Sequence, residues 1–227
     1  SGHDQYVQMQ SIYQGMSSVD AEIFNGSSGV LYVRKNIYGL SELQGMQARE
    51  FADWSAGHLD CFHYNGNGKA RTAISERLAS AVVFNAPDHL PVLKRFSDVP
   101  MFTSSGKQII ESGYDPESKI FTNMPQGFDP EMSLEQAWDL IDDLLKDFPF
   151  ESESDRTAAM AYPLTAMCRD LIDGPTPLFR FEAPSPGTGK SLLCRALSEI
   201  ITPYPSEGTL PDSEEETKKF FTTKLML

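Results

Sequence analysis

The chain has 227 residues, of which 40% are hydrophobic and 22% are charged, as in a folded globular protein rather than a disordered one. The formal net charge of −13 at pH 7 argues against a broad DNA-tracking surface, because phosphate contacts require clustered lysine and arginine. No apolar run approaches the ~20 residues of a membrane span, so we expect no membrane partner.

The chain begins Ser-Gly-His-Asp, without methionine and without a secretory signal, so we expect an expressed fragment that carries a tag remnant. Cys61, Cys168 and Cys194 are few, odd in number and far apart, which predicts a cytoplasmic location and no disulfide framework. Residues 58–63 read His-Leu-Asp-Cys-Phe-His. On a strand these groups divide between two faces, so we expect polar side chains there and no metal.

Residues 1–95 are predicted to form a small mixed α/β domain. Residues 1–28 are polar and turn-rich, with a loop at 25–29. The elements expected after them are a strand at 30–35, a helix that starts with a capping-box pattern at 41–44 and runs to about 56, a strand at 59–64 followed by an Asn-Gly turn, and an amphipathic helix at 72–84.

Residues 96–130 are predicted to be a β-rich connecting segment. A strand at 99–102 precedes a Ser-Ser-Gly turn and a second short strand at 108–110. An Asp-Pro turn within 114–121 predicts a hairpin, and 125–130 has the composition of a linker.

Residues 131–227 are predicted to begin with two helices. The first starts at Ser133 and has one apolar stripe, formed by Leu134, Ala137, Trp138, Ile141, Leu144, Leu145 and Phe148. Its aspartates lie outside the stripe and are expected to be solvated. The second helix is expected at 155–172, bent at Pro163, and it ends at Asp-Gly-Pro.

The most informative segment is 183–191, Ala-Pro-Ser-Pro-Gly-Thr-Gly-Lys-Ser, the second half of a phosphate-binding P-loop. A short apolar run at 177–182 predicts the strand before it, and 191–201 has helical spacing after it. Pro184 stands where the consensus has glycine, so the loop entry must differ locally. The fold class is therefore α/β, with an α+β N-terminal part and the first strand–loop–helix unit of a P-loop NTPase at the end.

The P-loop chemistry requires ATP and Mg²⁺ as cofactors. Glycines let successive amides point at a polyphosphate, and the helix N-terminus adds a favourable dipole. Lys190 is the catalytic candidate, because its ammonium would reach the β- and γ-phosphates, and Ser191 would bind the metal. The predicted nucleotide-binding residues are Gly187, Thr188, Gly189, Lys190, Ser191 and Leu192.

From about Leu93 onwards the chain resembles the replication ATPases and helicases of phages, plasmids and integrated elements, which are often joined to a primase. The similar segments are, in order, 90–93, 99–102, 113–115, 147–150, 173–178 and 183–191. The resemblance implies an AAA+-like ATP-hydrolysing motor for DNA replication, working as a homo-oligomeric ring that supplies an arginine between neighbours.

In that family an acidic helix like 213–226 precedes the Walker-B strand, so the sequence is expected to stop before Walker B. Asp212 and residues 214–216 are therefore not assigned to that role. The fragment is expected to hydrolyse ATP weakly or not at all. Two alternatives remain open: a P-loop kinase for a small molecule, and a non-enzymatic interaction module with an incomplete P-loop.

Single-stranded DNA is a possible further partner. The best basic patch with interleaved aromatics is Tyr32, Arg34, Lys35 and Tyr38. A plain strand surface is the preferred interpretation of these residues.

Overall fold

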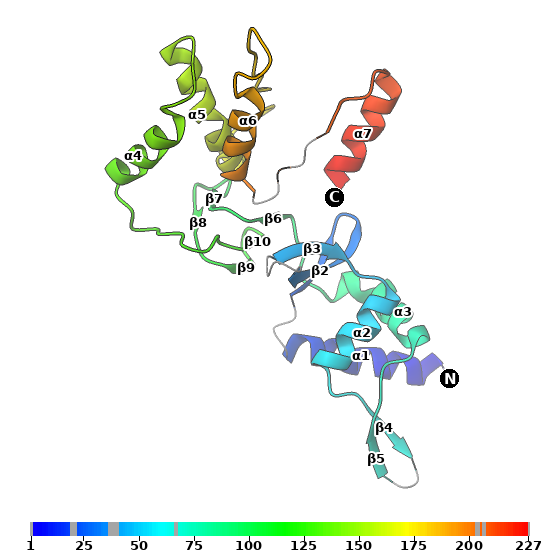
Figure 1. Cartoon of the computed structure of the whole chain (residues 1–227). Helices are drawn as coiled ribbons and strands as arrows, with labels where there is room; N and C mark the ends of the chain where they lie inside the picture. Colours follow the sequence, from blue (N-terminus) through cyan, green and yellow to red (C-terminus); the bar gives the residue numbers. More distant parts are fainter. Residues whose placement is uncertain are drawn as a thin grey trace. The chain divides into compact units, whose positions relative to one another are not determined.

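The computed structural model describes residues 2–18, 22–35, 41–65, 68–202, 205 and 208–226. The chain divides into two compact units, residues 1–94 with 221–227, and residues 95–220 (Figure 1). It is a mixed α/β chain with small sheets, in agreement with the coarse fold class. The three-part division at 95 and 130 stays a prediction. None of the described helices combines the length and the apolar character needed to cross a membrane.

The first unit combines an antiparallel sheet of order β1-β2-β3 with helices and a separate hairpin of β4 and β5. Its elements are α1 (Gly2–Ser18), β1 (Ile23–Gly26), β2 (Gly29–Lys35), β3 (Ser41–Gly45), α2 (Ala48–His58), β4 (Phe62–Asn65), β5 (Gly68–Arg71), α3 (Glu76–Asn85) and the 3₁₀ turn η1 (Ala86–Asp88). The predicted strand at 30–35 and most of the helix at 72–84 are confirmed. The strand predicted at 59–64 is shorter and begins at Phe62.

Helix α1 corrects the description of residues 1–28 as turn-rich. Met9, Ile12, Tyr13 and Met16 are buried in the core of this unit. Their spacing of three and four residues places them on one helical face, although glutamine and serine surround them. The Tyr13 hydroxyl donates a hydrogen bond to the carbonyl of Val82 at 2.8 Å, and burial raises the pKa of Tyr13 to about 12.

The prediction that residues 41–44 start a helix is wrong, because residues 41–45 form strand β3. The strand pairs with β2, with Tyr32 opposite Gln44. The Gln44 side chain accepts a hydrogen bond from the Tyr32 hydroxyl at 2.8 Å, so it is used across the sheet and not as a cap. Helix α2 starts only at Ala48, after Gly45, whose helix propensity is low.

The second unit begins with short strands and continues with helices. Its elements are β6 (Arg95–Ser97), β7 (Met101–Phe102), β8 (Gln108–Ile109), β9 (Gly113–Asp115), β10 (Ile120–Thr122), α4 (Leu134–Leu145), α5 (Glu153–Met167), the 3₁₀ turn η2 (Arg169–Leu171) and α6 (Lys190–Glu199). Helix α7 (Glu214–Met226) begins in this unit, and its residues from Phe221 onwards belong to the first unit. β7 and β8 form a hairpin, and the other strands form a sheet of order β6-β10-β9, with β6 parallel to β10. The hairpin predicted within 114–121 is confirmed as β9 and β10, and the short strands predicted at 99–102 and 108–110 are confirmed as β7 and β8.

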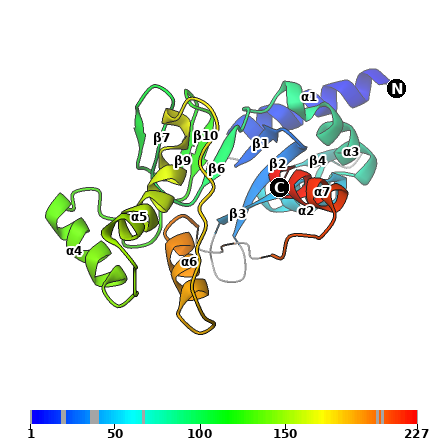
Figure 2. The ribbon, with the colours of Figure 1, turned by 90° about the horizontal axis from the view of Figure 1, so that it is seen from above.

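Helices α4, α5 and α6 lie next to one another in both views (Figures 1 and 2). Leu145, Ala159, Leu193 and Leu197 form their buried core. Helix α5 passes through Pro163 and ends at Met167, earlier than predicted. Of the predicted α4 stripe only Leu145 is buried; Leu134 and Trp138 remain 75% and 50% exposed.

Candidate phosphate-binding loop

The loop before α6 takes its shape from two glycines. Gly187 and Gly189 both have φ of 84°, in the left-handed region that glycine enters without a steric penalty. Gly189 is also the N-cap of α6, and its carbonyl accepts the first helical hydrogen bond, from the Leu193 amide, at 2.9 Å. The free amides of the first helical turn therefore start at the predicted loop.

Residues 183–192 alone line a hollow of about 580 Å³. This volume lies within the range of small-molecule sites. The Thr188 hydroxyl donates a hydrogen bond to the Ser185 carbonyl at 3.3 Å, which closes the turn internally. The structure thus places the six predicted nucleotide-binding residues around one concave surface.

Lys190 is the one charged residue among those that line the hollow. Its side chain is exposed, and within the described part of the chain its ammonium has no ion-pair partner. Ser191 follows it on the same first turn and is also exposed. An ammonium at a helix N-terminus is a favourable environment for an anion such as a phosphate.

Packing beneath the loop comes from the segment between α4 and α5. A Cβ built on Gly189 would stand 3.6 Å from Phe148 Cε1, which is ordinary van der Waals contact. Phe148 in turn packs against the buried core that Leu193 and Leu197 of α6 share with α4 and α5. Phe148 therefore lies between Gly189, at the start of α6, and the core of the three helices.

The strand predicted immediately before the loop is not present. Residues 177–182 have no regular secondary structure, and none of the described residues pairs with them as a strand. A strand is stable only when its backbone groups bond to a neighbour. Phe181 packs against the core of α4, α5 and α6, but Leu178 is 94% exposed.

The magnesium prediction rests on one oxygen. The Ser191 hydroxyl is exposed, and Mg²⁺ is commonly held by few protein oxygens together with substrate phosphates. The residue present fits that role. Among the described residues, no group of three or more histidine, cysteine or acidic side chains could hold a metal ion by itself, so the nucleotide would have to supply further ligands.

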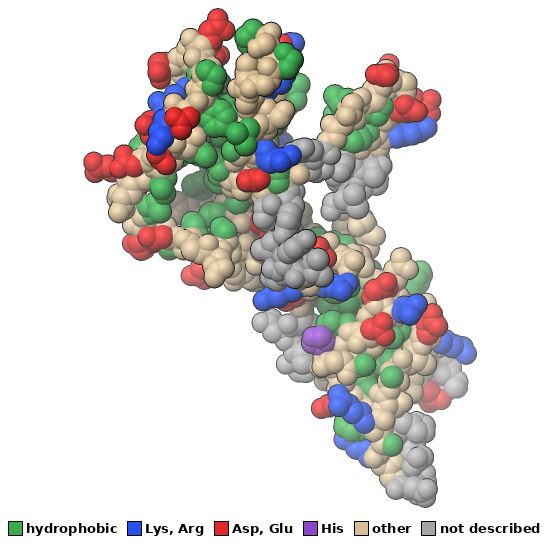
Figure 3. All heavy atoms as spheres, in the orientation of Figure 1, with side chains coloured by type: hydrophobic (Ala, Val, Ile, Leu, Met, Phe, Trp, Pro, Cys, Tyr) green, Lys and Arg blue, Asp and Glu red, His purple; other side chains and the backbone are tan. Residues whose placement is uncertain are grey.

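Two side chains of the predicted basic patch on β2 form hydrogen bonds across the sheet. Tyr32 and Arg34 both donate hydrogen bonds to the Gln44 side chain on β3, at 2.8 and 3.4 Å. Lys35 is exposed at the end of the strand, and Tyr38 lies outside the described residues. On the face in Figure 3, described acidic and basic side chains are interspersed over the surface.

No protein-family model, curated protein or solved structure matches this chain. The case for a function therefore rests on the residues and geometry of the loop.

Proposed function

We propose that this chain binds ATP with Mg²⁺ through residues 187–192 and belongs to the motor part of a replication-helicase-type ATPase of the AAA+-like class. The observation that carries the proposal is the loop itself: two left-handed glycines, a helix that begins at Lys190, and an exposed ammonium in a hollow lined only by residues 183–192. The resemblance of the chain from Leu93 onwards supports the motor class.

Each residue has a defined part in this proposal. The amides from Gly187 to Ser191 bind phosphate oxygens, and Lys190 neutralises the charge that develops on the γ-phosphate during transfer. Ser191 holds the metal ion that bridges the phosphates. In such motors ATP turnover drives the remodelling of nucleic acid.

Binding is expected to be stronger than turnover. Hydrolysis in these motors also needs a group that orients water and an arginine that reaches the transferred phosphate. The residues that line the hollow include no acidic side chain and no arginine. A neighbouring copy in a ring would supply the arginine, so assembly would raise the rate.

The proposal is tested with Lys190→Ala and a matched control, Lys218→Ala, which removes an exposed lysine from α7. Calorimetry should give a loss of about tenfold or more in ATP–Mg²⁺ affinity for the first variant, and no change for the second. The urea concentration at the midpoint of unfolding should be the same for both variants as for wild type. Undiminished affinity in Lys190→Ala would exclude the loop as the nucleotide site.

The effect of single-stranded DNA on the rate of ATP hydrolysis distinguishes a motor from a small-molecule kinase. A motor should hydrolyse ATP faster when DNA is added, whereas a small-molecule kinase should not respond. ATPase rates measured over a range of protein concentrations, with and without DNA, would test both this response and the role of assembly.

A further inference from the structure

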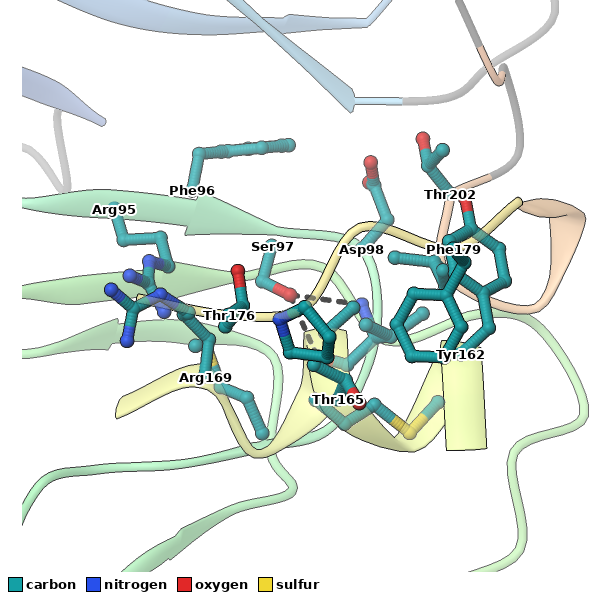
Figure 4. A pocket seen from close by; sticks show the side chains of 16 residues that line it. Arg95, Phe96, Ser97, Asp98, Tyr162, Thr165, Arg169, Thr176, Phe179 and Thr202 are labelled. Atoms are coloured by element: carbon teal, nitrogen blue, oxygen red, sulfur yellow. Dashed lines mark hydrogen bonds between the residues drawn. The ribbon is translucent and has the colours of Figure 1, made fainter. Parts of the chain in front are cut away.

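A second cavity, of about 440 Å³, lies in the unit of residues 95–220. Its lining comes from several segments of the chain. These are strand β6 and the residues after it, helix α5, turn η2, residues 176–179 and the residues after α6. Figure 4 shows the side chains that surround it. The cavity is lined by both aromatic rings and charged groups, which fits a ligand with both an apolar plane and a charge.

Two guanidinium groups lie at one end of this cavity, from Arg95 and Arg169 (Figure 4). Arg95 Nη2 is 2.9 Å from Asp170 Oδ1, and Arg169 Nη1 donates to the carbonyl of Ile172 at 3.0 Å. Each group is thereby held in place while it uses only some of its five N–H donors. Asp170 offsets one of the two positive charges. The two guanidiniums keep one net positive charge and several free N–H donors, which suit a phosphate.

Two aromatic rings, of Tyr162 and Phe179, lie toward the other end (Figure 4). Their centroids are 5.2 Å apart and their planes meet at 68°. The Tyr162 hydroxyl is 3.1 Å from Ser198 Oγ, so the tyrosine ring is held from α6. Such a pair of rings is a surface on which a nucleobase can stack.

Asp98 adds a carboxyl group at the end of the cavity where the two rings lie (Figure 4). Burial raises its pKa, and the hydrogen bond from the Asn123 side chain, at 3.2 Å, works in the opposite direction. This carboxyl can accept a hydrogen bond from a base amino group, and it disfavours a phosphate on its own side. Charge and shape therefore orient a ligand along the cavity.

We propose that this cavity binds one nucleotide unit, with the base against Tyr162 and Phe179 and the phosphate at Arg95 and Arg169. The site is distinct from the phosphate loop. The loop is at the start of α6 and the cavity includes Ile201 and Thr202 beyond its end, and a helix of ten residues is about 15 Å long. A free mononucleotide and a single strand offer the same chemistry.

The test uses the full chain with Lys190→Ala as background, without magnesium, so that the phosphate loop does not contribute. Calorimetric titrations with deoxyadenosine monophosphate and with single-stranded oligo(dA) should give saturable binding. Phe179→Leu removes a ring from a segment without regular structure, and Arg169→Gln removes a charge. Each should weaken binding about tenfold.

The chain offers neighbouring controls for both variants. Leu178→Ala alters an exposed side chain, and Arg180→Gln removes an exposed charge next to Glu182; both should bind as the background does. Stronger binding of the oligonucleotide would identify a strand as the source, and equal binding a free nucleotide. The proposal fails if neither probe binds, if both Phe179→Leu and Arg169→Gln bind normally, or if deoxyribose phosphate without a base binds equally well.

Wild type must bind deoxyadenosine monophosphate at this cavity as the Lys190→Ala background does. If wild type bound deoxyadenosine monophosphate and the Lys190→Ala variant did not, the nucleotide would bind at the phosphate loop. The proposal of a second site would then be refuted. The nucleotide-affinity test of Lys190 is read separately, because it uses ATP with magnesium.

Discussion

Asp115 is the residue whose charge contributes most clearly to the local fold of the second unit. Its carboxylate accepts hydrogen bonds from the Lys107 ammonium at 2.7 Å and from the Ser118 amide at 2.8 Å. The Lys107 bond is the largest cause that lowers the pKa of Asp115 to about 2, followed by the bonds from Ser118. These contacts tie the β9–β10 turn to the end of the β7–β8 hairpin.

A lowered pKa makes this contribution dependent on pH. The stabilisation is fully present above the unfolded pKa of 3.8 and is lost as the pH falls through about 2. We therefore expect Asp115→Asn to lower the free energy of unfolding at pH 7, and the difference from wild type to shrink below pH 4. Urea titrations from pH 3 to 7 measure it; a difference that stayed constant over this range would contradict the assignment.

At the scale of elements, α4 shows how a local signal defines a helix. The Ser133 hydroxyl accepts a hydrogen bond from the Gln136 amide at 3.2 Å, and the Gln136 side chain accepts one from the Ser133 amide at 3.0 Å. This reciprocal capping box satisfies two amides that the helix leaves free. Ser133 and Gln136 are only three positions apart in the chain, so the sequence alone could predict the cap.

Removal of this cap should destabilise the second unit. Ser133→Ala is expected to cost about 1 kcal/mol, because the Gln136 amide loses its partner. Urea unfolding followed by circular dichroism measures the change. Ser154→Ala, an exposed serine within the first turn of α5, is the matched control and should change stability by less than about 0.5 kcal/mol. Equal effects of both would mean that the cap contributes nothing.

Elements that depend on distant partners were harder to predict. The same capping pattern at Ser41 and Gln44 failed, because β2 offered residues 41–45 a pairing partner. Helix α1 was not predicted because its four buried residues lie in a segment rich in glutamine and serine, although their spacing is helical. The strand expected at 177–182 lacks any partner among the described residues, and a local pattern cannot reveal that.

At the scale of the molecule, the two candidate sites differ in how far sequence can predict them. The phosphate loop is one continuous segment, so its residues could be named in advance from their spacing. The second cavity combines Arg95, Tyr162 and Phe179 with residues from other segments. Only the folded chain brings such residues together, and no spacing in the sequence indicates it.

The two units have separate hydrophobic cores. The core of the first is formed by residues between Met9 and Ala86, and the helical core of the second by residues between Leu145 and Leu197. Since each core supplies the burial that stabilises its own helices, loss of packing in one should not open the other.

Two cavity-forming substitutions test this independence. Ile23 and Leu197 are both 1% exposed, and replacement of either by alanine should cost about 2–5 kcal/mol in its own unit. In hydrogen exchange followed by mass spectrometry, Leu197→Ala should raise exchange in α4, α5 and α6 and leave α1, α2 and α3 unchanged; Ile23→Ala should do the reverse. Leu178→Ala should alter neither set. Faster exchange in both units from either core variant would mean that they unfold as one cooperative body.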